Sequence, residues 1–321
     1  MVRKAIPSLV SACLVAFAAA CMVGGAWAEE PDGRTLVDRV DTLLWGKTLQ
    51  GEFQMTITTP RWQRALDLRA WMERPRRSFI RVLAPAKEAG IGSLRIGSEM
   101  WNYLPNIERT IKIPPSMMLQ PWMGSDFTND DLVKQSSAVD DYTHRVLRTE
   151  VLNGAASYVI ESIPKPDAAV VWGKILYWIR QADTIPLKQY YYNERNELVR
   201  VLTFSDVGPM GGRTIPTKWE MRPVNDPGHA TVIVVKAARY DQPIDDERFT
   251  QRNLQKCWRA AKFDPRFSSK FDPPRDGVKR YCGVDNSSFS ASLEPFRRAG
   301  LAFAELVLKR HDSLPVSTMW Q

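Results

Sequence analysis

The chain has 321 residues, of which 44% are hydrophobic and 25% are charged, and its formal net charge is +8. The hydrophobic share is ordinary for a globular protein and excludes a mainly disordered chain. Residues 29–256 carry 31 basic against 29 acidic side chains, so this part of the chain lacks the basic footprint that nucleic acid requires. We therefore expect no nucleic-acid partner.

The first 28 residues have the pattern of an export signal. Arg3 and Lys4 form a short basic start, residues 9–25 are small and apolar, and Ala26-Trp27-Ala28 supplies small residues at the −3 and −1 positions. This pattern predicts cleavage after Ala28 and a periplasmic mature protein. A lipoprotein anchored at Cys21 is the alternative, because three alanines precede that cysteine.

The remaining chain divides into a body, residues 29–256, and a C-terminal appendage, residues 257–321. In the appendage the alternation typical of strands disappears and basic residues outnumber acidic ones. Cys257 and Cys282 both fall there, and an oxidising compartment would permit a disulfide between them. The body contains no cysteine, which excludes a thiol nucleophile or a thiolate metal site within it.

The body begins with one helical segment and continues as strands. Apolar residues recur every three or four positions over residues 36–44, which predicts a helix with one buried face. After Gly46 the hydrophobic period changes to two, and turn residues separate the alternating runs. The expected strands are 53–57, 66–72, 78–83, 92–97, 99–104, 107–113, 142–151, 157–163, 174–180, 186–192, 197–205, 214–222 and 230–237. This succession predicts a mainly β (α+β) fold built on an antiparallel meander.

Two segments interrupt the meander. Residues 114–123 are apolar but broken by prolines, so they cannot form a central strand. Residues 126–132 have the pattern of a helix start, which Thr128 or Asn129 can cap. A short closing helix is expected after residues 245–247.

Catalytic and metal-binding patterns are weak in the body. Its two histidines are His144, expected on the solvent side of a strand, and His229, expected in a turn, and no Gly-x-Ser-x-Gly motif accompanies them. The aspartates around residue 130 lack the glycine and terminal glutamate of a calcium loop. We expect no enzyme, no metal and no cofactor. A secreted hydrolase using Asp126 and Asp131 is the competing hypothesis.

Large, soft apolar side chains are the most distinctive feature of the body. They crowd the irregular segment at Met117, Met118, Trp122 and Met123, and they share strand faces at Trp101 with Tyr103 and at Trp219 with Met221. Methionine adapts to irregular apolar ligands, and tryptophan brings a large area with one polar edge. These residues either fill an ordinary core or contact a lipid-like partner.

The body resembles the LolA-like outer-membrane lipoprotein-sorting family over about residues 30–255. The resemblance is carried by Trp101-Asn102-Tyr103-Leu104-Pro105, by residues 107–113, and by Gly124-Ser125-Asp126-Phe127 with Asp130-Asp131-Leu132. More narrowly, the string resembles the branch often found beside lipid exporters of the RND (resistance-nodulation-division) or MMPL type.

This resemblance implies a strongly curved antiparallel sheet that forms an incomplete β-barrel, with a few helices covering an apolar cavity for acyl chains. Residues 117–123 would then form the mouth or lid of the cavity. The implied ligand-binding residues are Phe53, Met55, Leu66, Leu68, Trp101, Tyr103, Met117, Met118, Trp122, Met123, Trp219 and Met221. Alternation alone leaves open which strand face points inward.

The implied function is that of a periplasmic carrier, which shields the acyl chains of lipoproteins or lipids during transfer toward the outer membrane. Its partners would be an inner-membrane transporter of the RND/MMPL or ABC type and an outer-membrane acceptor. A non-ferrying periplasmic subunit or sensor of an RND-type lipid exporter is the alternative within the same fold.

Overall fold

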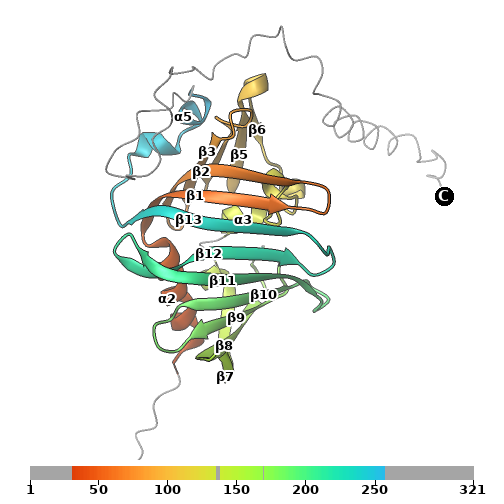
Figure 1. Ribbon diagram of the computed structural model, residues 1–321, viewed down its shortest axis with the longest axis vertical. Coiled ribbons are helices and arrows are strands. Elements are labelled where there is room, and N and C mark those ends of the chain that lie inside the picture. The colour runs from red at the N-terminus through yellow and green to blue at the C-terminus, as the bar shows by residue number, and fades with distance from the viewer. Residues whose placement is uncertain (1–30, 135–137, 169, 257–321) are drawn as a thin grey trace, which may run out of the picture.

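Antiparallel strands form one large, strongly curved sheet that dominates the fold (Figure 1). The computed structural model describes residues 31–134, 138–168 and 170–256. The strands are β1 (Thr48–Thr58), β2 (Gln63–Glu73), β3 (Arg77–Ala84), β4 (Gly92–Ile96), β5 (Glu99–Leu104), β6 (Arg109–Lys112), β7 (Tyr142–Leu152), β8 (Ala155–Pro164), β9 (Lys174–Arg180), β10 (Pro186–Tyr192), β11 (Leu198–Met210), β12 (Arg213–Pro223) and β13 (Ala230–Tyr240).

The sheet consists of two meanders joined side by side. Its 13 strands run in the order β6-β5-β4-β3-β2-β1-β13-β12-β11-β10-β9-β8-β7. The meanders meet where β1 pairs with β13, with Met55 opposite Ile233. Because β6 and β7 lie at opposite ends of this order, the sheet stays open within the described residues. The predicted mainly β, incomplete-barrel architecture is confirmed.

The helices are short and lie against the sheet. They are α2 (Gly33–Trp45), α3 (Asn129–Lys134), α4 (Ala138–Asp141) and α5 (Gln251–Gln255), with 3-10 turns η1 (Pro105–Ile107), η2 (Pro115–Met117), η3 (Trp122–Gly124) and η4 (Asp246–Phe249). None of the helices in the described ranges combines the length and apolarity that crossing a bilayer would need.

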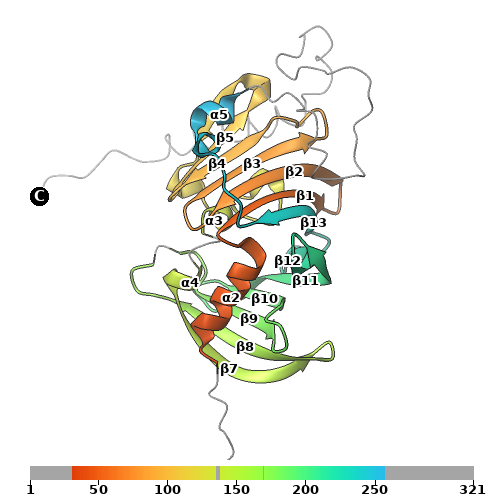
Figure 2. The same cartoon turned by 90° about the vertical axis from the view of Figure 1, so that its left-hand side faces the viewer.

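Helix α2 covers the concave face of the sheet over strands β7–β12 (Figure 2). Asp32 caps its start by accepting a hydrogen bond from the Thr35 amide at 3.0 Å, and Gly46, with φ of 61°, ends it. The helix buries Leu36, Val37, Val40 and Leu44 in the main core. The predicted helix at 36–44 is confirmed and extends slightly at both ends.

The proline-broken segment covers the concave face over strands β1–β6. Trp122 anchors it, since its side chain is buried and its Nε1 donates to Ser93 Oγ at 3.1 Å. A bridge between Pro121 and Thr128 closes a tight loop around this anchor. We call residues 114–134, which include η2, η3 and α3, the cap segment. Its predicted place outside the regular sheet is confirmed.

A second, smaller core lies on the opposite face of β3–β5. Phe79 and Leu94 pack there with Phe249 and Leu254 from the closing η4–α5 segment. Arg81 fixes this segment, because its Nη2 donates to the carbonyl oxygens of Asn253 and Leu254, each at 3.0 Å. The closing helix predicted after residues 245–247 is confirmed.

The strand predictions agree closely with the observed sheet. The largest overestimate is 107–113, because η1 takes up its beginning and β6 is limited to Arg109–Lys112. The strand predicted at 197–205 was too short, since β11 continues to Met210. The helix start predicted at Thr128 or Asn129 is α3, and Thr128 is its cap, with Oγ1 accepting from the Asp131 amide at 3.2 Å. The predictions for the signal, Cys21, the appendage, Cys257 and Cys282 lie outside the described residues.

Candidate ligand-binding cavity

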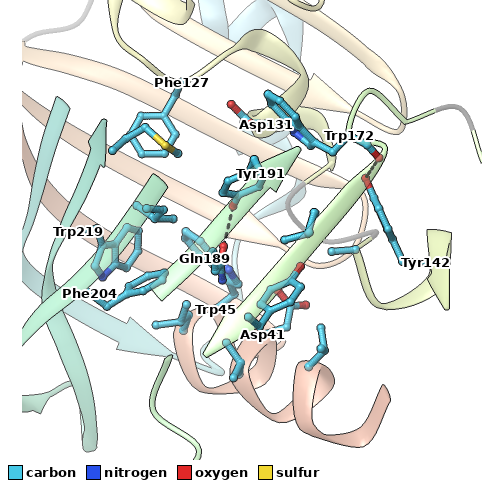
Figure 3. A pocket seen from close by; sticks show the side chains of 18 of the residues that line it. Asp41, Trp45, Phe127, Asp131, Tyr142, Trp172, Gln189, Tyr191, Phe204 and Trp219 are labelled. Carbon is cyan, nitrogen blue, oxygen red and sulfur yellow. Dashed lines mark hydrogen bonds between the residues drawn. The ribbon is translucent and has the colours of Figure 1, made fainter. Parts of the chain in front are cut away.

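A cavity of about 120 Å³ lies between α2, the α3 end of the cap segment and the sheet strands β9–β12 (Figure 3). Its walls combine the buried face of a helix with the inward face of a curved sheet. The lining residues are Val37, Val40, Asp41, Leu44, Trp45, Phe127, Asp130, Asp131, Ala138, Tyr142, Val170, Trp172, Ile175, Tyr177, Gln189, Tyr191, Leu202, Phe204, Trp219 and Met221.

Most of this lining is apolar or aromatic. Trp45 of α2 meets Trp219 of β12 edge to face, with ring centroids 5.3 Å apart, and Phe204 of β11 lies 6.2 Å from the same ring. The indole Nε1 of Trp219 is satisfied by the Pro216 carbonyl at 2.8 Å. The aromatic end of the cavity is therefore held rigidly and offers hydrocarbon-like surface to a ligand.

An ion pair closes the cavity on the α3 side. Arg200 of β11 donates to both carboxylate oxygens of Asp131, with Nη1 2.7 Å from Oδ2, and to the Asp126 carbonyl at 3.1 Å. Its guanidinium lies between two rings, 4.2 Å from Trp172 and 4.6 Å from Tyr191. The Arg200 side chain is only 4% exposed.

Arg200 stays protonated although its side chain is buried. Desolvation lowers the pKa of the guanidinium, but the ion pair and hydrogen bonds with Asp131 outweigh it, so the net shift is upward. Arg200 and Asp131 therefore act as one neutral unit that fixes the first turn of α3 to the sheet. We call this pair, with its two flanking rings, the α3 clamp.

The other aspartate of the hydrolase hypothesis also has a structural partner. Asp126 Oδ2 accepts from Thr231 Oγ1 at 2.7 Å, and the Asp126 amide donates back to that oxygen at 2.9 Å. Burial raises the pKa of Asp126. Capping and anchoring thus account for Asp126 and Asp131, and no group of three potential metal ligands occurs in the described ranges.

Asp41 brings a carboxyl group to the α2 side of the cavity. It is 8% exposed, and its Oδ2 forms an ion pair with Arg74 at the start of the β2–β3 turn. Burial raises the pKa of Asp41 to about 7, and the Arg74 charge opposes that rise. Asp41 therefore ties α2 to the sheet and stands partly protonated near neutral pH.

Three tyrosines from neighbouring strands complete the polar lining. Tyr191 donates to Gln189 Oε1 at 2.6 Å, and Tyr142 reaches the Trp172 carbonyl at 3.4 Å (Figure 3). Tyr177 also lines the cavity, and burial raises its pKa well above the ordinary value.

His144 does not face solvent as predicted. Its Nδ1 lies 2.7 Å from Ser162 Oγ and its Nε2 lies 3.2 Å from the Val139 carbonyl, so it joins β7, β8 and α4. The prediction failed because α2 and α4 cover the strand face on which His144 lies. Ser162 is fully buried, and His144 is half-buried.

Of the residues predicted to bind ligand, the structure brings Trp219 and Met221 to the cavity. Phe53 lies close by, with its ring 6.3 Å from Trp219. Three other predicted residues of β1 and β2 lie deeper in the main core and do not line this cavity. These deeper residues are Met55, Leu66 and Leu68.

The remaining candidates separate into two places. Met117, Met118 and Met123 are half-buried where the cap segment packs against the main core. Trp101 and Tyr103 lie on the opposite face, in the small core under α5, and do not reach the cavity. Whether any of the twelve residues binds a ligand stays a prediction.

Several residues in or beside the cavity were not anticipated, notably Asp41, Tyr177 and Tyr191 in its lining and Arg200 in the adjoining α3 clamp. One signal was available for Arg200. It occupies the same alternating register as Leu202 and Phe204, and a charge on an otherwise apolar strand face indicates a buried partner. The sequence predicted the buried face of α2. It did not predict the cavity beneath this face, because the cavity depends on how α2 docks on the sheet.

An open, curved antiparallel sheet with helices covering an apolar cavity defines a LolA-like fold. A DUF1329-like family model, described as an uncharacterized protein, matches residues 74–256, and the chain belongs to this family. The predicted LolA-like fold is confirmed. No curated protein matches the chain significantly.

Solved structures from three bacteria share the fold. A DUF1329 family protein from Desulfovibrio piger is 24% identical, with a TM-score of 0.64, covering 69% of this chain and 97% of its own. A putative outer membrane lipoprotein-sorting protein domain from Vibrio parahaemolyticus is 20% identical, with a TM-score of 0.61 and coverages of 70% and 98%. A LolA superfamily protein from Nitrosomonas europaea is 18% identical, with a TM-score of 0.61 and coverages of 70% and 100%.

Proposed function

We propose that this protein is a non-catalytic periplasmic carrier that shields the acyl chains of lipoproteins or lipids in the cavity under α2. The observation that carries the proposal is an apolar cavity on the helix-covered concave face of an open sheet. The fold shared with a putative lipoprotein-sorting domain supports the same assignment.

The energetics favour sequestration without chemistry. Burying one methylene group is worth about 0.8 kcal/mol, so a sixteen-carbon chain gains on the order of 12 kcal/mol when it leaves water. A carrier supplies this apolar surface and needs no reactive group. Asp126, Asp131 and His144 are consistent with a protein that needs no reactive group. Each of these side chains forms a hydrogen bond or ion pair that holds two elements together.

The cavity must widen to accept a whole acyl chain. Its volume of about 120 Å³ is below the roughly 150 Å³ of an engineered apolar cavity that holds one benzene molecule. In this proposal α2 and α3 are the elements that separate, because side-chain contacts rather than strand pairing hold them to the sheet, and these contacts include two ion pairs. These pairs are Asp41 with Arg74 and the α3 clamp. In this proposal they open together to admit cargo.

The carrier would receive cargo from an inner-membrane transporter of the RND/MMPL or ABC type and deliver it to an outer-membrane acceptor. The leader pattern of residues 1–28 supports a periplasmic site of action, with cleavage after Ala28. The acyl chains of the cargo are the part that the cavity would hold.

Lipid extraction and native mass spectrometry of the full chain, purified from a Gram-negative periplasm, test the proposal. We expect co-purifying acyl lipids and saturable uptake of a fluorescent fatty acid. Val40→Phe should reduce uptake several-fold, because the larger side chain fills the cavity from α2. The matched control is Val151→Phe, at an exposed position of β7. Equal uptake by both variants, or an empty protein retained by an exporter, would contradict the carrier proposal.

A further inference from the structure

A second, smaller cavity adjoins the main one at Trp45 of α2. Its volume is about 20 Å³, which is enough for a water-sized group such as one oxygen atom of a ligand. Its lining residues are Trp45, Met72, Glu73, Arg74, Arg77, Ser78, Arg95 and Leu132. Because Trp45 lines both cavities, a ligand that lies in the apolar cavity can reach the smaller one with its polar end.

Three arginines come together in this lining, and the main cavity has none in its own. Arg77 of β3 is balanced by two carboxylates, since it forms ion pairs with Glu73 at 2.6 Å and with Asp246 at 2.7 Å. Glu73 is also the one carboxylate in the lining. Any excess of positive charge in the smaller cavity therefore comes from Arg74 and Arg95.

Arg74 has a buried donor in reserve. Its Nη2 forms the ion pair with Asp41, and its Nη1 donates to the Gly46 carbonyl at 3.3 Å. Its Nε is buried and forms no hydrogen bond with any of the described residues. Because burial raises the pKa of Asp41 to about 7, that carboxyl group balances the Arg74 charge only in part near neutral pH. A ligand that accepts from Nε would recover the cost of this buried donor.

Arg95 brings a second guanidinium to the same lining from β4. The residue is 7% exposed, and its Nη2 donates to the Pro75 carbonyl at 2.6 Å. Burial lowers the pKa of Arg95 to about 10, so the side chain still carries its charge at neutral pH. Two charged guanidinium groups at one small cavity favour an anion, because arginine donates strong, charge-assisted hydrogen bonds to carboxylate and phosphate oxygens.

We propose that the smaller cavity binds the anionic headgroup, a carboxylate or a phosphate, of a lipid whose hydrocarbon chain lies in the main cavity. Arg74 and Arg95 donate to the headgroup oxygens, and Trp45 separates the headgroup from the chain. This inference rests on the proposed carrier function, and it names the chemical class of the lipid that the carrier prefers.

Displacement of a neutral fluorescent probe from the full chain tests the inference with hexadecyl phosphate, palmitate and hexadecanol. At neutral pH we expect the two anionic ligands to bind about tenfold more tightly than hexadecanol, because a charged acceptor strengthens its hydrogen bonds with arginine. Inorganic phosphate distinguishes a lipid headgroup from a free anion. It should displace little of the probe, because it lacks the chain that the main cavity would hold.

Two pairs of variants assign the preference to this cavity. Arg95→Gln should lose most of the preference for anionic ligands, whereas Arg76→Gln should keep it, since Arg76 is exposed in the same β2–β3 turn and lines neither cavity. Ser78→Asp places a carboxylate among the lining arginines and should also abolish the preference. Ser78→Asn has nearly the same size without the charge and should retain most of it. Hexadecanol affinity shows in each variant whether the main cavity is intact.

The outcomes separate this inference from the carrier proposal. Equal affinity for the anionic ligands and hexadecanol overturns the headgroup inference, while the carrier proposal stands. A preference that persists in Ser78→Asp also overturns it, and this variant decides the question if Arg95→Gln does not fold. Displacement by inorganic phosphate as effective as that by hexadecyl phosphate would indicate a free-anion site and overturn the lipid headgroup. Binding of none of the three lipid ligands overturns the carrier proposal as well.

Discussion

Arg200 of β11 and Asp131 of α3 form a bidentate ion pair, 69 positions apart in the chain, between the rings of Trp172 and Tyr191. This pair joins the cap segment, which covers the β1–β6 half of the sheet, to the β7–β12 half that contains the cavity. A buried electrostatic contact therefore connects the two halves of the sheet on the α3 side of the cavity.

Removing one partner of the α3 clamp should be strongly destabilising. Asp131→Asn leaves the Arg200 charge buried without its counter-charge, and breaking a buried pair costs about 3–5 kcal/mol. Urea unfolding measures this loss. The control is Arg145→Ala, which breaks a pair with Glu161 whose arginine is largely exposed and should cost no more than about 1 kcal/mol. Similar losses in the two variants would show that the clamp does not hold α3.

Charging the methionines of the cap segment should weaken lipid capture without unfolding the protein. Met117→Asp with Met118→Asp places two carboxylates where half-buried side chains meet the main core. The backbone contacts of these residues remain, since their carbonyls accept from Asn129 and Asp130 at 3.0 and 2.9 Å. Uptake of a fluorescent fatty acid should fall several-fold.

The neighbouring residue provides the control for that experiment. Leu119 is 58% exposed, so Leu119→Asp adds a charge to the same segment without touching the core. Uptake should stay near the wild-type value in this variant. Unchanged uptake in the double methionine variant would show that Met117 and Met118 do not contact the lipid as it enters the protein.

Titration of Asp41 should make stability depend on pH. Because its folded pKa is raised from 3.8 to about 7, the folded state holds this proton more tightly than the unfolded state. The stabilisation is fully present below about pH 3.8 and is lost as the pH rises through about 7. We expect the free energy of unfolding to fall less over this window in Asp41→Asn than in the wild type.

The matched control for the pH experiment lies on the same helix. Asp38→Asn removes a carboxylate that is 55% exposed and lies 4.0 Å from the same arginine, Arg74. Its pH profile should shift only slightly from that of the wild type, because the Asp38 charge raises the pKa of Asp41 less than burial does. If Asp38→Asn flattens the profile as much as Asp41→Asn does, burial of Asp41 is not the cause.

Local periodicity in the sequence was enough to predict the strands and the first helix, whereas the incomplete barrel was implied by the family resemblance. A period of two identified the strands because one face of each strand packs on a core and the other meets solvent or a second core. The three-to-four spacing identified α2 for the same reason. The proline-rich interruption was recognised because proline cannot join a central sheet ladder.

The location of the cavity could not be predicted in this way. Alternation placed Trp101 with Tyr103 and Trp219 with Met221 on common faces, but both faces of this sheet carry apolar cores. Whether a face lies under α2 or under α5 is decided by long-range docking, to which the strand pattern contributes nothing. Tyr177 was overlooked because its place in the cavity wall depends on how α2 docks over β9.

Truncation at two points should separate the predicted domain, residues 29–256, from the appendage. A chain ending at Lys256 keeps Phe249 and Leu254, which are 3% and 0% exposed in the small core, and keeps the carbonyls that Arg81 binds. We expect its melting temperature to match that of the full chain. A chain ending at Gln242 uncovers both side chains and leaves Arg81 without those carbonyls, so its melting temperature should drop by several degrees. A large drop in melting temperature for the chain ending at Lys256 would show that residues 257–321 belong to the folding unit. That truncation leaves the contacts among the described residues intact, so they could not explain the loss.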